Sequence, residues 1–155
     1  MSRPPRIPNW LPWEQSTIYF LTFCVQKRKR VVANAQAWRV CRSTFERLDQ
    51  WTFLAAVAMP DHVHVLATPK DRAASVSQLV KWFKRWFNEK YREAVAIESE
   101  LTSWEWQEGA FDRLLRSDES LTAKWHYIRQ NPVRGGLVTD PDDWPYQFQF
   151  DGSQW

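Results

Sequence analysis

The order of strand-like and helix-like segments constrains the fold of this chain more than any other feature of its sequence. β-Branched and aromatic residues mark the strand segments, and apolar residues spaced three and four apart mark the helix segments. On these criteria we expect strands at residues 17–25, 51–59, 62–68 and 104–116, the last one interrupted by a turn at Gly109. We expect helices at residues 35–50, 75–91 and 117–130.

In chain order these segments form the pattern β-α-β-β-α-β, followed by one more helix. That pattern is the split arrangement of a ferredoxin-like α+β fold, an antiparallel sheet with its helices on one face. The additional C-terminal helix ends before Pro132, because a residue that precedes proline disfavours helical dihedrals. We therefore predict one domain over residues 17–138, between a proline-rich extended arm at residues 1–16 and a short tail at residues 139–155.

Composition limits the class of protein. The chain has 155 residues with 25% charged and 44% hydrophobic side chains, as in ordinary globular domains, and no apolar run long enough for a membrane span. Cys24 and Cys41 lack the spacing of a disulfide framework, so we expect a reducing, cytoplasmic location and no membrane partner. The 11 tryptophans in a chain of net charge +3 indicate a nucleic-acid partner.

Positive charge is concentrated in two segments, a basic loop after the first strand and the helix that begins near Ser75. We expect the cations to contact the phosphates of a nucleic acid and the two tryptophans among them to stack on its unpaired bases. A solvated surface explains the charges equally well, and packing explains the tryptophans equally well. The candidate nucleic-acid-binding residues are Lys27, Arg28, Lys29, Arg30, Lys81, Lys84, Arg85, Trp82 and Trp86.

Two of the three histidines, His62 and His64, stand two residues apart in the third strand segment. Side chains at i and i+2 of a strand project from the same face, about 6.5 to 7 Å apart. The two imidazoles can therefore converge on one divalent cation, while Val63 and Val65 face the core. An ordinary pair of half-buried histidines has the same spacing, and the pattern alone does not exclude it.

The last helix segment places Tyr127 and Asn131 beside a packing stripe of three apolar residues. Residues four apart on a helix project side by side, so these two side chains would face the same neighbour. Asn131 can supply an amide oxygen as a third, hard ligand to a cation that two imidazoles hold. A tyrosine at the edge of the core with a solvated hydroxyl is the alternative for Tyr127. The apolar stripe consists of Leu121, Trp125 and Ile128.

Together these motifs resemble the HUH single-strand endonucleases, in which two histidines flank a hydrophobic residue. Within that superfamily the chain is similar to the single-tyrosine transposases of the smallest bacterial insertion sequences, and most of all to the REP-associated tyrosine transposases. The resemblance covers residues 8–137, and its most distinctive segments are WQEGAFDRLLR and YIRQNPVRGGLV. Asp61 stands where relatives often have Asn, and Gly135 where Ala is usual.

The resemblance implies a metal-dependent endonuclease and strand transferase that acts on single-stranded DNA at palindromic hairpins. Tyr127 would be the nucleophile that forms a 5′-phosphotyrosine link and releases a 3′-hydroxyl, so that the bond energy is kept for religation. Mg²⁺ or Mn²⁺ on His62, His64 and Asn131 would polarise and orient the scissile phosphate. The insertion-sequence relatives tend to have Gln at the position of Asn131, and the change keeps the amide oxygen.

Other functions fit the sequence less well. A hairpin-binding regulator that has lost cleavage is the runner-up, and the intact His62, His64 and Tyr127 argue against it. The small size and the YIRQNPVRGGLV segment disfavour a replication initiator or relaxase, and the same segment disfavours an unrelated metal-binding protein. We expect a monomer or a homodimer, and no residue stands out as the general base for Tyr127.

Overall fold

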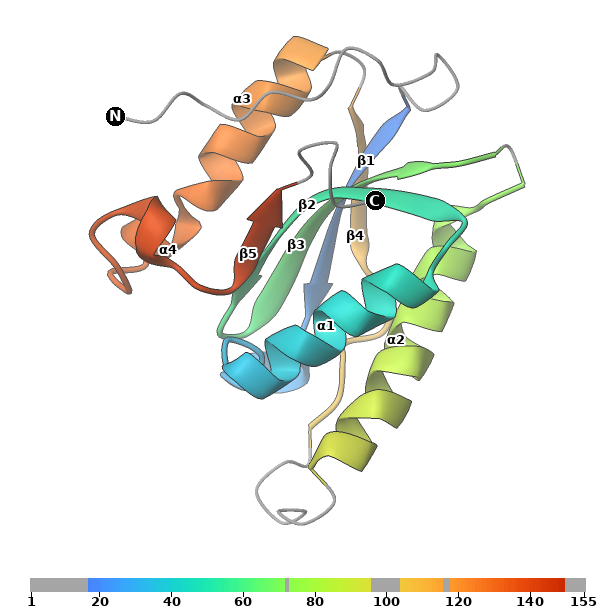
Figure 1. The fold of residues 1–155 in the computed structure, drawn as a ribbon, viewed down its shortest axis with the longest axis horizontal. Coiled ribbons are helices and arrows are strands. Elements are labelled where there is room, and N and C mark those ends of the chain that lie inside the picture. The colour runs from blue at the N-terminus through green and yellow to red at the C-terminus, as the bar shows by residue number, and fades with distance from the viewer. Residues whose placement is uncertain (1–16, 72, 96–103, 116–117, 150–155) are drawn as a thin grey trace.

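The computed structural model describes residues 17–71, 73–95, 104–115 and 118–149. Five strands in these ranges form one antiparallel sheet with the order β4-β1-β3-β2-β5 (Figure 1). The strands are β1 (Ile18–Cys24), β2 (Trp51–Met59), β3 (His62–Pro69), β4 (Phe111–Leu115) and β5 (Gln147–Gln149). The α-helices are α1 (Ala35–Arg47), α2 (Val76–Ala94), α3 (Asp118–Arg129) and α4 (Asn131–Arg134).

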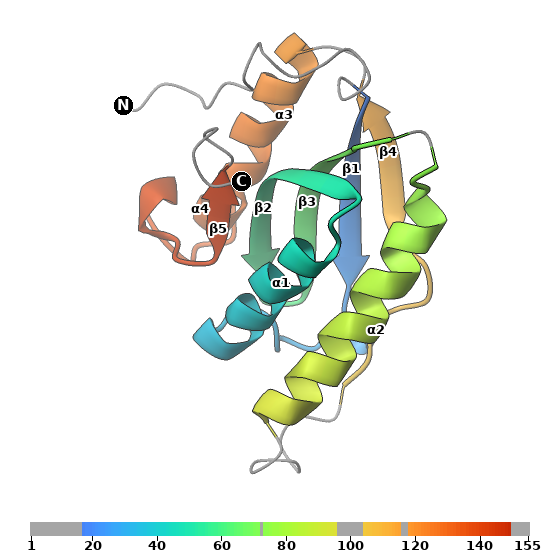
Figure 2. The same ribbon diagram turned by 45° about the vertical axis from the view of Figure 1, so that its right-hand side comes forward.

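This architecture confirms the predicted α+β fold, with the order β-α-β-β-α-β and an additional C-terminal helix. Helices α1 and α2 cover one face of the sheet, and α3 lies on the other (Figures 1 and 2). All nine residues of β2 are buried, because both faces of this interior strand are covered. No helix in the described ranges is long and apolar enough to cross a membrane.

The sheet separates two apolar cores. Alternate residues of each strand point to opposite faces, so Val65 packs in the core under α1 and α2, whereas its neighbour Leu66 packs in the core under α3. The predicted stripe on α3 is confirmed, because its three residues are buried in the second core. Their exposed fractions are 0% for Leu121, 4% for Trp125 and 2% for Ile128.

The segment predicted to be a tail contains the fifth strand. The three residues of β5 pair with β2, and two tryptophan contacts hold the segment in place. The indole of Trp144 donates a hydrogen bond to the carbonyl of Ala58 on β2, at 3.0 Å. The indole of Trp125 on α3 donates to the side chain of Gln149, at 3.3 Å. Residues 147–149 are therefore part of the sheet, and Trp144 and Gln149 help to support α3.

A proline divides the C-terminal helical segment into α3 and α4. Pro132 lacks the N–H that would bond to the carbonyl of Ile128, and α3 ends at Arg129. Arg134 bridges the break, because its guanidinium donates to the backbone carbonyl of Tyr127 at 2.8 Å. The predicted helix end is therefore confirmed, and one further helical turn follows it.

Candidate active site

His62 and His64 project from the face of β3 that α3 covers. Their Nε2 atoms lie 3.1 Å apart, and the Nδ1 atom of each ring bonds to a neighbour. The Nδ1 atom of His62 is 2.7 Å from Oδ1 of Asp61, and that of His64 is 2.9 Å from Oγ1 of Thr22 on β1. Val63, between them, is fully buried on the opposite face. The predicted convergence of the two imidazoles is thus present.

The outer contacts determine which nitrogen is available to a ligand. A carboxylate only accepts hydrogen bonds, so Asp61 holds the proton of His62 on Nδ1 and leaves the Nε2 lone pair free. Donation from Nδ1 of His64 to the Thr22 hydroxyl has the same effect on the second ring. Asp61 is itself fixed by the guanidinium of Arg28, at 2.8 Å. This is the usual outer arrangement around histidines that bind metal.

Both imidazoles are kept neutral, as metal binding requires. Burial, with smaller contributions from the charges of His62, Lys124 and Arg134, lowers the pKa of His64 to about 3. Burial also lowers the pKa of His62, although the carboxylate of Asp61 opposes this shift. At neutral pH both rings therefore have an unprotonated nitrogen directed at the shared point.

The spacing of the two nitrogens fits one divalent ion. Ligand nitrogens that each lie about 2.1 Å from an ion and are 3.1 Å apart subtend an angle of roughly 95° at it, close to the right angle of octahedral coordination. No cluster of three His, Cys, Asp or Glu side chains in the part of the chain that the structure describes could hold a metal ion. Any third protein ligand among these residues is therefore of another type, such as an amide.

Tyr127 lies on the same face of the sheet as the histidines. The ring of Phe20 on β1 stacks on His64, with ring centroids 5.1 Å apart. The ammonium of Lys124 on α3 lies 4.5 Å from the Phe20 centroid and 5.7 Å from the Tyr127 centroid. This series of contacts runs from the histidine pair to the tyrosine. The side chain of Tyr127 is 59% exposed, so it is accessible to a large substrate.

Two cations lie close to the tyrosine ring. The guanidinium carbon of Arg134 lies 4.0 Å from the centroid of the Tyr127 ring, closer than the ammonium of Lys124. Arg134 also donates to the side-chain oxygen of Asn131, the first residue of α4. An amide oxygen has two lone pairs, so one is left for a further contact. Arg134 thereby links the backbone of the tyrosine to the predicted third ligand.

The structure divides the nine predicted DNA-binding residues between two places. The basic loop that contains Lys27, Arg28, Lys29 and Arg30 is exposed and follows β1. It lies beside the histidine site, because Arg28 is bonded to Asp61 and Cys24 is paired with His62. Lys27 and Arg28 have positive φ angles of 59° and 53°.

The other five predicted residues lie on α2, across the sheet from Tyr127. The ammonium of Lys84 donates to the backbone carbonyls of Gln107, at 2.7 Å, and Gly109. Burial lowers the pKa of Lys84. This lysine therefore stabilises the turn before β4, which has a positive φ at Gly109. Lys81, Trp82, Arg85 and Trp86 are at least partly accessible on the same helix.

Five residues around the site were not among the predicted site residues: Thr22, Phe20, Asp61, Lys124 and Arg134. Arg134 belongs to the distinctive YIRQNPVRGGLV segment, which is a signal for its importance. Thr22 is one threonine in an apolar strand, and its contact with His64 arises from the pairing of β1 with β3. No local pattern identifies that contact, nor those of Phe20 and Lys124.

Comparisons with known proteins bear on this arrangement. A family model described as "Transposase IS200 like" matches residues 14–131, more than half of the chain. A curated protein of Haemophilus influenzae named "Putative REP-associated tyrosine transposase" is 26% identical, over 83% of this chain and 77% of its own.

Two solved structures share the fold. A REP-associated tyrosine transposase bound to a REP hairpin has 18% sequence identity and a TM-score of 0.65, and the match covers 91% of this chain and 82% of that one. A "putative transposase" of Deinococcus radiodurans R1 has 16% identity and a TM-score of 0.55, and covers 81% of this chain and 96% of its own.

Proposed function

The chain belongs to the family of IS200-like transposases, and on this basis we propose that it is a metal-dependent endonuclease and strand transferase for single-stranded DNA. The substrate is a palindromic hairpin with single-stranded extensions. The observation that carries the proposal is the convergence of His62 and His64 on the face of the sheet that also carries Tyr127. A metal-binding pair and an accessible nucleophile are the two parts that the reaction needs.

The proposed reaction exchanges one phosphoester for another. The phenolic oxygen of Tyr127 attacks the phosphorus, and the bond from phosphorus to the 3′ oxygen of the preceding nucleotide breaks. The products are a 5′-phosphotyrosine and a free 3′-hydroxyl, which receives the proton that the phenol loses. The reverse attack by a 3′-hydroxyl reseals or transfers the strand without an external source of energy.

The surrounding residues prepare this step. His62, His64 and the amide oxygen of Asn131 would hold Mg²⁺ or Mn²⁺, which polarises the scissile phosphate when bound. Arg134 and Lys124 place positive charge next to the tyrosine ring, where the negative oxygens of the phosphate must approach. Preorganised cations of this kind stabilise charge that develops during the reaction.

A hairpin is the DNA form that the comparisons favour. The solved relative that shares the fold is described as bound to a REP hairpin. The exposed loop of Lys27, Arg28, Lys29 and Arg30 stands beside the histidine site, and its charges suit the phosphates of a strand entering that site. We assign this loop to substrate binding.

A doubly labelled oligonucleotide tests the proposal. Hairpins with single-stranded extensions, taken from palindromes that flank the gene, carry one dye at the 5′ end and another at the 3′ end. With Mn²⁺ or Mg²⁺ we expect an adduct that resists denaturation and carries only the 3′ dye, while the 5′ dye leaves on a shorter fragment. Tyr127→Phe and a chelator should each abolish the adduct.

The exposed His126, next to the nucleophile on α3, supplies a matched control. His126→Ala should form the adduct as the wild type does. If the protein binds the hairpin tightly but forms no adduct with either metal, the proposed endonuclease activity is wrong and a non-cleaving regulator is favoured. An adduct that carries the 5′ dye would contradict the proposed polarity of the phosphotyrosine link.

A further inference from the structure

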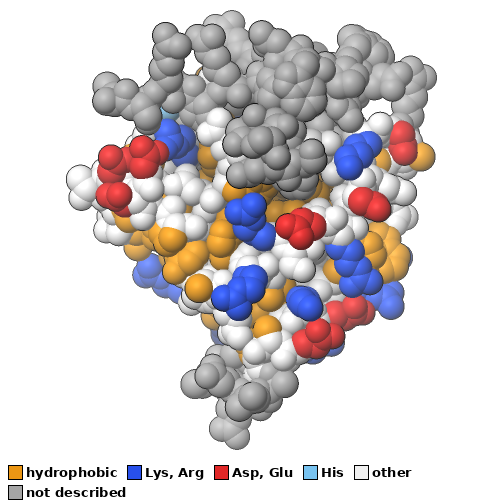
Figure 3. Space-filling model, in the orientation of Figure 1, with side chains coloured by type: hydrophobic (Ala, Val, Ile, Leu, Met, Phe, Trp, Pro, Cys, Tyr) orange, Lys and Arg blue, Asp and Glu red, His pale blue; other side chains and the backbone are white. Residues whose placement is uncertain are grey.

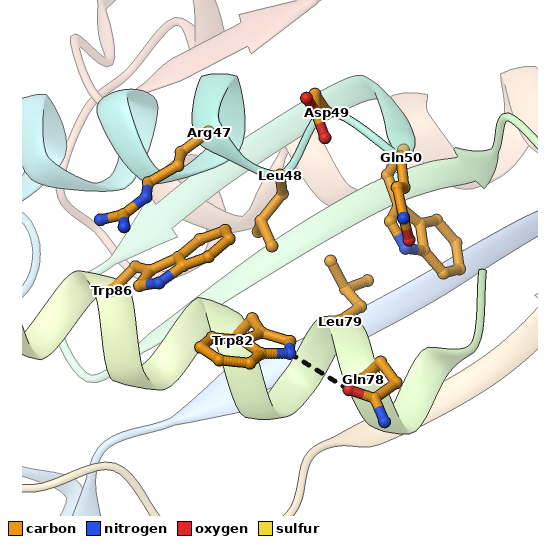
Figure 4. A pocket seen from close by; sticks show the side chains of 9 residues that line it. Arg47, Leu48, Asp49, Gln50, Gln78, Leu79, Trp82 and Trp86 are labelled. Carbon is orange, nitrogen blue, oxygen red and sulfur yellow. Dashed lines mark hydrogen bonds between the residues drawn. The ribbon is translucent and has the colours of Figure 1, made fainter.

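A pocket lies between the C-terminal end of α1 and the helix α2, on the face of the sheet opposite Tyr127 (Figure 4). Its volume is about 160 Å³. Drug-sized ligands fill about 300 to 1,000 Å³, so this pocket has room for one ring system rather than for a whole nucleotide chain. Its aromatic lining is formed by Trp51, Trp82 and Trp86.

We propose that this pocket binds one unpaired base of the DNA substrate, at a second contact site separate from the site of cleavage. The inference rests on the proposed function for the identity of the ligand as DNA. It extends that function by assigning a base-binding role to a face of the molecule that contains neither the histidine pair nor the tyrosine.

Both indoles on α2 line the pocket, and Trp82 offers the face on which a base would stack, because Arg47 lies over the ring of Trp86. Trp82 and Trp86 are one helical turn apart, with ring centroids separated by 5.1 Å and planes inclined by 39°. Both side chains pack on the core, yet both are only partly buried. The indole of Trp82 donates to the side-chain oxygen of Gln78, at 3.1 Å, which fixes its orientation. Partly exposed, oriented indoles are the surfaces on which unpaired bases stack.

Three cations surround these indoles. The guanidinium carbon of Arg47 lies 4.2 Å from the Trp86 ring (Figure 4). The guanidinium carbon of Arg85 and the ammonium of Lys81 lie 5.2 Å and 5.4 Å from the Trp82 ring. Phosphates on either side of a stacked base would meet these charges.

Acidic groups and amides complete the surroundings. Asp49 lines the pocket, and Glu89 lies 3.7 Å from Arg85. The amides of Gln50 and Gln78 line the pocket as well. A glutamine side chain presents a donor and an acceptor, which are the groups needed at the edge of a base. Figure 3 shows basic side chains over this face, with hydrophobic and acidic ones between them.

The pocket and the candidate active site lie on opposite faces of the sheet, so base binding and cleavage occur at separate places. His64 and Tyr127 lie on the α3 side of the sheet, whereas the pocket lies on the α1 and α2 side. A base held here cannot be the base beside the phosphate that Tyr127 attacks. It belongs to another unpaired part of the substrate, either the loop of the hairpin or the far end of an extension.

Fluorescence anisotropy with Tyr127→Phe as the parent protein tests this, because binding is then measured without cleavage. A series of hairpins carries one abasic site at each unpaired position in turn. We expect one position at which loss of the base weakens binding about 10-fold. With the added substitution Trp82→Leu, which keeps an apolar side chain, the same abasic site should cause no further loss.

Trp82→Phe keeps an aromatic face and should retain most of the affinity, and thermal unfolding of both variants shows that the fold is intact. Arg47→Gln should weaken binding and reduce its salt dependence. If the parent binds hairpins and every pocket variant binds them equally, the pocket inference is wrong and the indoles serve packing alone. If the parent binds no hairpin, the proposed function itself is wrong.

Discussion

The two halves of the candidate active site are held in different ways. His62 and His64 stand on the central strand β3, and each ring is fixed through its Nδ1 atom by a residue of the same end of the sheet. Tyr127 stands on α3, which meets the sheet through one apolar stripe, and its side chain is 59% exposed. The position of the proposed metal ligands therefore depends on the hydrogen bonds of the sheet, and the position of the proposed nucleophile depends on how α3 packs on it.

This difference predicts two kinds of damage. Substitutions around the histidines should change metal affinity and leave the free energy of unfolding nearly unchanged. Substitutions under α3 should lower the free energy of unfolding and misplace the nucleophile, while the histidines keep their metal affinity. Four variants or conditions test whether the halves are separable in this way.

Removal of one imidazole should have the largest effect. His64→Ala deletes one of the two converging nitrogens, and metal stabilisation of several kcal/mol corresponds to a loss of about a thousandfold in the rate of adduct formation. Single-turnover gels with Mn²⁺ measure that rate. If His64→Ala forms the adduct at the wild-type rate, the histidine pair has no role in the reaction.

Removal of the main anchor of α3 should have the next largest effect. The side chain of Trp125 is 4% exposed, and Trp125→Ala should lower the free energy of unfolding by about 3 to 5 kcal/mol, measured in urea. Adduct formation should fall as well, whereas calorimetry should find Mn²⁺ affinity unchanged in the folded protein. If Trp125→Ala lowers Mn²⁺ affinity and the rate of adduct formation by the same factor, the two halves of the site are not separable. Trp125→Phe is the matched, milder variant.

Loss of an orienting hydrogen bond should have a smaller effect. Thr22→Val removes the hydroxyl that contacts Nδ1 of His64, and the loss of such an outer partner lowers metal affinity about 10- to 100-fold. Thr44→Val is the control, because its hydroxyl bonds to the carbonyl of Val40 on α1, away from the site. If the two variants bind Mn²⁺ equally well, the contact of Thr22 does not orient the ligand.

Within the first pH unit below 6.5, acid should have the smallest effect. The pKa of His64 is about 3 in the folded protein, well below the ordinary value of 6.5, so between these pH values the unfolded chain binds a proton that the folded chain does not. The free energy of unfolding should therefore fall as pH decreases from 6.5, by at most about 1.4 kcal/mol per unit from this group. His64→Gln should flatten that slope in urea titrations, and a slope equal to that of the wild type would contradict the assignment to His64.

Local patterns were sufficient for much of the fold and for the centre of the site. The strand Trp51–Met59 has the predicted bounds, because an unbroken apolar run is followed by the turn at Pro60. The stripe on α3 follows from helical periodicity, and the shared face of His62 and His64 follows from the two-residue period of a strand. These features depend only on residues that are close in sequence.

Features that depend on distant residues were not predictable. The strand Gln147–Gln149 has three residues and no β-branched side chain, so only its pairing with β2 identifies it. In the sequence, Lys84 stands among other basic residues and therefore looks like a DNA-binding lysine. Its structural role arises only because the fold brings the carbonyl of Gly109 within hydrogen-bonding distance of its ammonium. The contact of Thr22 with His64 likewise exists because β1 pairs with β3 in that register.

The hydrogen bond between Trp125 and Gln149 has a consequence for the order of synthesis. The residues of β5 leave the ribosome after the whole of α3, so the tyrosine helix is complete before the strand that supports its anchor exists. Trp144 and Gln149 must both be made before Trp125 gains all of its partners. A nascent chain that has already released Tyr127 from the ribosome therefore still lacks part of the packing that supports α3.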